Sequence, residues 1–285
     1  MDELSRAVKE AFRQRKAPDG KNYNSLSIPA AHIIAEKLSC SIKDVEFAAL
    51  QDGIIPERYH RSMGTTGGPQ GQIKLLQSRV AVIGLGGLGG LVAELLARMG
   101  VGTLVLADGD RFSDSNLNRQ VLSTELNLEE SKASAAVKRV QAVNAAVNAV
   151  SFQGIVDEKN AASLLEGCQA VVDCLDNLKS RFLLEKTCRE LDIPLVHGAI
   201  AQFMGQVSTI FPGDPGLEAI YGPLKDGHDK GVEVELGNPA STPALVAAWQ
   251  VQEVIKILLE KGVPLRNRLL FMDTEQGTCD IFQLE

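Results

Sequence analysis

A run of glycines follows an apolar stretch near residue 80. The segment "VAVIGLGGLGGLVAELLARMG", residues 80 to 100, places Gly84, Gly86 and Gly89 in a G-x-G-x-x-G spacing. Glycines at such positions permit a tight turn and let backbone N–H groups approach a phosphate at a helix N-terminus. The segment therefore predicts a buried strand, a phosphate-binding turn and a helix that ends at Gly100.

An acidic residue follows the next apolar stretch. The segment "TLVLADGD" ends in Asp108, at about the distance downstream where a carboxylate meets a ribose hydroxyl in a βαβ unit. Residues 79 to 110 are therefore predicted to form a mononucleotide-binding half. The alternative, that the glycines serve only close packing, gives no reason for Asp108.

Further charged residues come at the expected ends of strands and starts of helices. Arg119 lies in the polar run "GDRFSDSNLNRQVL", Lys132 lies near the start of a predicted helix, and Asp176 follows the strand "AVVD". Ligands of open α/β sheets bind outside the carboxyl ends of the strands, so these side chains are expected in one crevice. Two cations and an extra carboxylate suit a triphosphate with a metal ion, and they suit a neutral hydride acceptor poorly.

The whole-chain composition excludes several classes of protein. The 285 residues carry a net charge of -7, which argues against a general nucleic-acid binder. We find no run of eighteen apolar residues, and the charged N-terminus does not resemble a secretory signal, so a cytoplasmic location without membrane contact is expected. Five cysteines without a C-x-x-C pair indicate reduced thiols.

Three motifs in a fixed order carry a family resemblance. The chain has G-x-G-G-x-G, then S-N-L-x-R-Q in "DGDRFSDSNLNRQ", then D-x-x-D-N in "DCLDN", with "RYHRSMG" before them and "PLVHGAIAQFMGQVSTIFP" after them. In these stretches it resembles the MoeB/ThiF/HesA adenylyltransferases, which are similar to the adenylation half of ubiquitin-activating enzymes. The resemblance covers roughly residues 55 to 285. It implies an α/β fold with a Rossmann-like, ATP-binding, doubly wound sheet and C-terminal antiparallel strands.

The resemblance also implies roles for particular residues. Arg119 would approach the phosphates, Lys132 would neutralise charge that develops during transfer, and Asp176 would hold Mg²⁺. Arg61 would reach the γ-phosphate from the other subunit of a homodimer. The remaining nucleotide-site residues implied by the matched stretches are Gly84, Gly86, Gly87, Gly89, Asp108 for the ribose, Asp110, Asn116 for the phosphates, and Asn177, with Gln120 and Arg181 in support.

The implied reaction agrees with these residue types. The C-terminal glycine carboxylate of a ubiquitin-like sulfur-carrier protein, in molybdopterin or thiamine synthesis, is already ionised and needs no general base. The enzyme has to align that carboxylate and offset phosphate charge, which arginine, lysine and Mg²⁺ do. A peptide carboxylate or a tRNA base as acceptor, and an NAD-dependent oxidoreductase, are the alternatives.

One departure from the family pattern concerns cysteine. Many members bind a structural zinc through two C-x-x-C pairs, but the corresponding regions here read "FPGDPGLEAIYGPLK" and "FMDTEQGTCDIFQLE". ATP and Mg²⁺ are therefore the expected cofactors, and no zinc is predicted. His197, at the end of the strand "IPLVHGAI", is expected to be a hydrogen-bonded histidine at a strand end, with contact to the ligand as the alternative, and Asp173 is expected at most to cap the following helix.

The predicted organisation has two parts. Residues 1–54 form a small N-terminal helical extension, with a helical hairpin that breaks at Ser39 to Ser41. DNA recognition by this hairpin is not favoured, because its second helix lacks arginine. Residues 55–285 form the adenylation domain, in which 213–242 is a crossover loop. The apolar helix from Pro243 to Leu259 is expected to be buried at a dimer interface, and a β-hairpin closes the chain.

Overall fold

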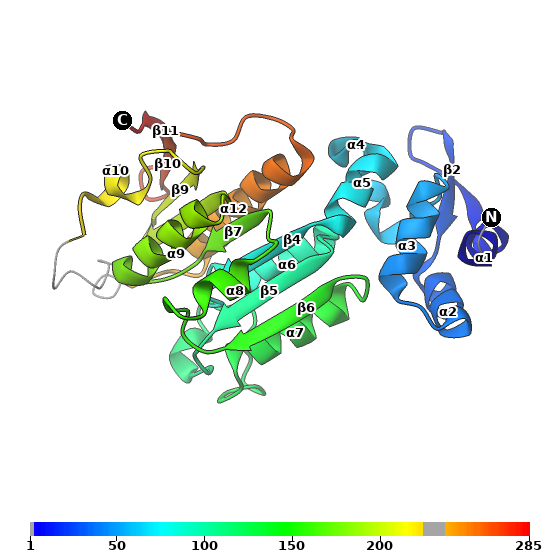
Figure 1. The fold of residues 1–285 in the computed structure, drawn as a ribbon, viewed down its shortest axis with the longest axis horizontal. Helices are drawn as coiled ribbons and strands as arrows, with labels where there is room; N and C mark the ends of the chain where they lie inside the picture. Colours follow the sequence, from blue (N-terminus) through cyan, green and yellow to red (C-terminus); the bar gives the residue numbers. More distant parts are fainter. Residues whose placement is uncertain (1–2, 225–236) are drawn as a thin grey trace.

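The computed structural model describes residues 3–224 and 237–285. Its centre is an eight-stranded sheet in the order β11-β10-β9-β8-β7-β4-β5-β6 (Figure 1). The parallel strands are β4 (Arg79–Ile83), β5 (Thr103–Asp108), β6 (Asn148–Gln153), β7 (Ala170–Asp173) and β8 (Leu195–Ala201). The chain order reverses beside β4, which lies between β5 and β7, and this is the doubly wound topology that the sequence predicted.

Antiparallel strands complete one side of the sheet. They are β9 (Met204–Ile210), β10 (Arg268–Asp273) and β11 (Thr278–Gln283). The last two are joined by residues 274 to 277, "TEQG", where Gly277 has a φ of 70° that a glycine adopts without strain. The predicted C-terminal antiparallel strands are therefore confirmed.

Helices cover both faces of the sheet. Neighbouring residues along a strand point to opposite faces, so Val80 and Val82 of β4 belong to one core cluster and Ala81 and Ile83 to another. Helices α6 (Gly89–Met99), α7 (Lys132–Val143) and α12 (Ser241–Leu259) cover the first face, and α8 (Ala161–Leu165), α9 (Leu178–Glu190) and α10 (Leu217–Tyr221) cover the second (Figure 1).

The N-terminal extension contains strands as well as helices. It comprises α1 (Glu3–Ala11), β1 (Arg13–Lys16), β2 (Asn22–Leu26), α2 (Ile28–Leu38), α3 (Ile42–Gln51) and β3 (Ile55–Pro56), and the strands form a three-stranded sheet. The expected break at Ser39 to Ser41 is confirmed: Ser39 adopts the left-handed conformation, and Ser41 caps α3 in a capping box with Asp44. The strands were not predicted, because β1 reads "RQRK", is exposed throughout and has no apolar alternation.

A short connection joins the extension to the sheet. It contains η1 (Glu57–Ser62), α4 (Met63–Thr66) and α5 (Gly68–Gln77), and α5 leads directly into β4. Because α3 packs on α5, the extension lies near the end of the sheet where β4 begins (Figure 1). The carboxyl end of β4, where the glycine turn follows, faces the opposite way.

The predicted crossover loop is only partly described. Within 213–242, α10 occupies 217 to 221 and α12 already begins at Ser241, whereas residues 225–236 lie outside the described part of the chain. Helix α12 is buried along most of its surface, but Leu245 and Trp249 remain 45% and 38% exposed. The expectation of a buried helix thus holds except for this stripe. No helix in 3–224 or 237–285 is long and apolar enough to cross a membrane.

Candidate active site

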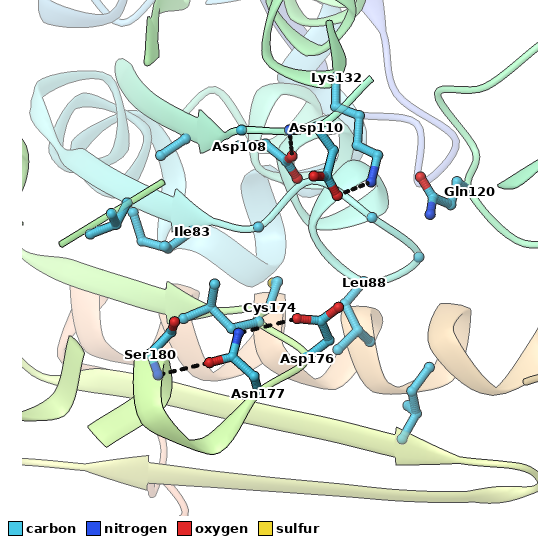
Figure 2. Close-up of a pocket in the computed structure, with 18 of the residues that line it drawn as sticks. Ile83, Leu88, Asp108, Asp110, Gln120, Lys132, Cys174, Asp176, Asn177 and Ser180 are labelled. Atoms are coloured by element: carbon cyan, nitrogen blue, oxygen red, sulfur yellow. Dashed lines mark hydrogen bonds and ion pairs between the residues drawn. The ribbon is translucent and has the colours of Figure 1, made fainter. Parts of the chain in front are cut away.

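A cavity of about 790 Å³ opens at the carboxyl ends of β4, β5 and β7 (Figure 2). This is the edge of the sheet where ligands of doubly wound folds bind. The structure brings most of the predicted site residues into the wall of this cavity, namely Gly84, Gly86, Gly87, Asp108, Asp110, Arg119, Gln120, Lys132, Asp176, Asn177 and Arg181.

The glycine turn forms one side of the cavity. Gly84 has a φ of 88°, and a Cβ on it would lie 2.6 Å from the carbonyl oxygen of Cys174, so both conformation and space require glycine. Gly89 is not in the cavity wall. A Cβ there would overlap the carbonyl oxygen of Gly84, so Gly89 lets helix α6 pack against the turn.

Asp108 lies at the end of β5 and is held by the backbone. Its carboxylate accepts hydrogen bonds from the N–H of Leu85 at 2.6 Å and the N–H of Asp110 at 2.7 Å. Burial raises the pKa of Asp108, and the two hydrogen bonds and the nearby Lys132 ammonium oppose that shift. The first bond ties the carboxylate to the glycine turn, so the ribose-binding candidate and the phosphate-binding candidate form one rigid unit.

Lys132 is a buried cation in the wall of the cavity. It is the first residue of α7, its side chain is 8% exposed, and its Nζ lies 2.9 Å from the carboxylate of Asp110 (Figure 2). Asp110 is 74% exposed at the mouth of the cavity. Because Asp110 is exposed, water can solvate its carboxylate when the Lys132 ammonium turns from it to a phosphate.

Asp176 and Asn177 occupy the turn after β7. Asn177 caps α9 by accepting a hydrogen bond from the N–H of Ser180 at 2.9 Å, and its amide donates to Asp176 at 3.3 Å (Figure 2). Asp173 was expected at most to cap this helix. That expectation is wrong, because the N-cap residue of α9 is Asn177. The exposed Asp176 carboxylate faces the cavity and fits Mg²⁺, which proteins hold through one or two carboxylates together with substrate phosphates.

A buried polar network supports the turn that carries Asp176. His197 is fully buried, with Nδ1 2.7 Å from Asp173 and Nε2 3.0 Å from the hydroxyl of Tyr221. Arg181 donates to that hydroxyl at 3.1 Å and to the carbonyl oxygen of Leu175 at 2.6 Å. Burial lowers the pKa of His197, although the Asp173 carboxylate opposes the shift, so the neutral ring is favoured, and both ring nitrogens have the hydrogen-bond partners expected of a satisfied strand-end histidine.

Other predicted residues lie outside the cavity wall. Asn116 is buried, and its side-chain oxygen accepts a hydrogen bond from the N–H of Ser113. Arg61 lies in η1 and lines a separate hollow beside the N-terminal extension. The structure therefore gives Asn116 a local structural contact and does not bring Arg61 to the nucleotide cavity of its own chain.

The structure adds residues that sequence reasoning missed. Gly237 and Asn238, at the end of the crossover segment, line the cavity, and the Asn118 amide donates to the Asn238 carbonyl oxygen at 3.2 Å. Tyr221 also went unrecognised, since no sequence pattern joins it to His197. Across the described ranges no group of three or more His, Cys, Asp or Glu side chains could hold a metal ion, and the absence of zinc stays a prediction.

The doubly wound sheet and the charged cavity at its switch point are the arrangement in which α/β proteins of the nucleotide-binding class hold their ligands. The model of the ThiF family matches residues 59–285, and the chain belongs to the ThiF family. The family expected from the three motifs is therefore confirmed.

Curated relatives cover most of the chain. It is 39% identical to the SAMP-activating enzyme E1 of Haloferax volcanii over 75% of this chain and 79% of that protein. It is 38% identical to the sulfur carrier protein adenylyltransferase of Thermus thermophilus, over 78% and 84%. It is 36% identical to the molybdopterin-synthase adenylyltransferase of Haemophilus influenzae, over 71% and 84%.

Solved structures share the fold. One is of PaaA, with a TM-score of 0.69 and 21% identity over 80% of this chain and 82% of that one. Another is of Escherichia coli MccB with ATP, with a TM-score of 0.68 and 21% identity over 80% and 71%. At these identities the likeness concerns the fold alone.

Proposed function

We propose that this protein is an ATP-dependent adenylyltransferase that activates the C-terminal carboxylate of a ubiquitin-like sulfur-carrier protein. The observation that carries the proposal is the cavity in which the glycine turn, Asp108, Lys132 and Asp176 lie together at the switch point of the sheet. The names of the Thermus and Haemophilus relatives support the reaction and the acceptor class.

Different residues of the cavity bind different parts of ATP. Asp108 accepts hydrogen bonds from the ribose hydroxyls, and the N–H groups of the glycine turn face the phosphates. Arg119, whose side chain lies beside Gly87 of the glycine turn, and Lys132 offset the negative charge on the phosphates. Asp176 holds Mg²⁺, which supplies further charge neutralisation at the phosphates when bound.

The reaction then needs alignment more than proton transfer. A carboxylate oxygen of the carrier attacks the α-phosphorus, an oxygen–phosphorus bond forms, and the bond to the β-phosphate oxygen breaks as pyrophosphate leaves with the electron pair. Lys132 turns from Asp110 to the phosphates, where it stabilises the charge that builds up in the transition state. The carboxylate is ionised at neutral pH, so no general base is required.

We include a two-fold homodimer in the proposal. Arg61 lies in η1, before β4, and does not line the nucleotide cavity of its own chain. The exposed Leu245 and Trp249 form an apolar stripe on α12, and a second chain would cover this stripe. In this arrangement Arg61 contacts the phosphates bound in the partner's cavity.

Subunit exchange tests the dimer. An Arg61→Ala chain and a Lys132→Ala chain, each inactive alone, are mixed under conditions that exchange subunits. A mixed dimer has one site that lacks both side chains and one intact site, so part of the activity should return. Verified exchange without recovery would mean that Arg61 acts in its own subunit or not at all.

Isotope exchange between pyrophosphate and ATP tests the reaction. We expect exchange that depends on Mg²⁺ and on a carrier that ends in glycine. A peptide or tRNA acceptor predicts exchange with that acceptor instead. Tight NADH binding without ATP binding would favour an oxidoreductase.

A further inference from the structure

A second hollow, of about 560 Å³, lies between the N-terminal extension and η1. Three cationic residues line it: Arg15 and Lys16 of β1, and Arg61 of η1. Its one acidic residue is Glu57. The hollow therefore carries an excess of positive charge on a protein whose net charge is -7, and an anion is the ligand that this contrast favours.

The wall of the hollow is held in place by side-chain contacts. The Glu57 carboxylate accepts hydrogen bonds from the hydroxyls of Ser25 and Tyr23, and it lies 3.6 Å from the guanidinium of Arg15. The ring of Tyr23 stacks on that of His60 at 4.0 Å between centroids. Glu57 thus joins β1 and β2 to η1, and the cations project from a fixed surface.

Two of the cations are available to a ligand. Among the described residues, neither Lys16 nor Arg61 forms an ion pair, and Arg15 shares Glu57 with two hydroxyl donors. The oxygen atoms of a phosphate chain can accept charge-assisted hydrogen bonds from these exposed groups.

The hollow and the nucleotide cavity of the same chain lie at opposite ends of β4. The extension packs on α5, which leads into the start of β4, whereas the glycine turn follows its carboxyl end (Figure 1). The two cavities share no lining residue. A phosphate ligand of the hollow therefore comes from outside the nucleotide cavity of its own chain.

We infer that Arg15 and Lys16 extend the Arg61 surface into a binding site for the triphosphate of ATP held by a partner subunit. This inference rests on the proposed adenylyltransferase and its homodimer. It adds to them a role for the β1–β2 hairpin, which lies before the residues 59–285 that the family model matches. The hairpin strengthens ATP binding in trans.

The perturbation is the double variant Arg15→Gln, Lys16→Gln. Loss of two exposed cations should raise the dissociation constant and the KM for ATP roughly three- to tenfold, and should make ATP binding less sensitive to salt. The matched control is Arg13→Gln, Lys21→Gln, which removes two cations from the same hairpin outside the hollow. Thermal unfolding confirms that both variants fold.

Subunit exchange then identifies which ATP the hairpin contacts. Chains with the Arg15→Gln, Lys16→Gln hairpin are mixed with an excess of Lys132→Ala chains, which have an intact hairpin and an inactive site. Nearly every active site then belongs to a hairpin-variant chain that is paired with an intact hairpin. Action in trans predicts that the KM for ATP returns to the wild-type value. A KM that stays raised would overturn the inference, because the hairpin would then act on its own chain.

Inorganic tripolyphosphate separates a free anion from bound ATP. If the hairpin variant loses tripolyphosphate binding but keeps the wild-type KM for ATP, the hollow binds free anions and the inference fails. Equal effects of the hairpin variant and its control would also overturn it. Failure of the proposed function looks different, because the wild-type protein itself would then show neither ATP binding nor pyrophosphate exchange.

Discussion

Replacement of His197 by leucine tests the buried network behind the active site. Leucine keeps most of the apolar volume and removes both ring nitrogens. The change deletes the 2.7 Å bond to Asp173 and the 3.0 Å bond to Tyr221. Asp173 keeps the N–H of Leu175 at 3.0 Å, and its distance to the guanidinium of Arg181 is 3.6 Å, so its carboxylate is only partly compensated.

The structure gives the size of the effect. A hydrogen bond to a charged group contributes about 1.5–3 kcal/mol and a neutral one about 1 kcal/mol, so His197→Leu should lower the free energy of unfolding by about 3 kcal/mol. For a domain of this size that corresponds to a fall in Tm of roughly 6–12 °C. Urea unfolding measures the free energy, and His32→Leu, at an exposed histidine, serves as the control.

The effect should also depend on pH. Burial lowers the pKa of His197 below its ordinary value of about 6.5, so the unfolded chain binds more protons than the folded one at this position. The stability contributed by the neutral ring is complete above about pH 6.5 and is lost as the pH falls through the folded value. The difference between wild type and His197→Leu should therefore shrink in acid. A loss under about 1 kcal/mol with no pH dependence would refute this account of the network.

Three further predictions concern the cavity and metal content. Asp176→Ala should abolish Mg²⁺-dependent pyrophosphate exchange while thermal unfolding stays near wild type; normal exchange would remove Asp176 from the site. Gly89→Ala should lower the Tm and weaken ATP binding, because its Cβ would overlap the carbonyl oxygen of Gly84, whereas Gly64→Ala, with open space around it, should do neither; equal effects would contradict the packing argument. Metal analysis of the purified protein should find no stoichiometric zinc, and one zinc per chain would show an unrecognised ligand set.

Local sequence signals predicted the centre of the sheet and most of the cavity. The glycine turn follows β4 directly, Asp108 is the last residue of β5, and Asp176 lies three residues after β7 ends, so their positions depend on where a buried apolar strand ends. Because the strands are parallel, their carboxyl ends lie at the same edge of the sheet for any conformation of the loops. The position of Lys132 was predictable for a related reason, because this residue begins helix α7 at the same edge of the sheet.

Contacts between distant segments were not predictable in this way. His197 and Tyr221 lie on β8 and α10, and no spacing relates a strand residue to a helix beyond the next strand. The β1–β2 hairpin was missed because its first strand is charged and exposed, although "APDG" at residues 17 to 20 is a turn signal. Asn116 has a local contact that the motif alone does not predict, since its side-chain oxygen accepts the N–H of Ser113, and its approach to the phosphates stays a prediction.

The central claim is that the cavity transfers AMP to the C-terminal carboxylate of a carrier. The most direct measurement is the intact mass of a ubiquitin-like sulfur-carrier protein after incubation with this enzyme, ATP and Mg²⁺. The account predicts an AMP adduct on the carrier that ends in glycine, released pyrophosphate in equal amount, and no adduct with the Lys132→Ala enzyme or with a carrier that lacks its C-terminal glycine. A folded enzyme that binds ATP and yields no adduct on any such carrier, or an adduct that forms equally well with Lys132→Ala, would contradict it.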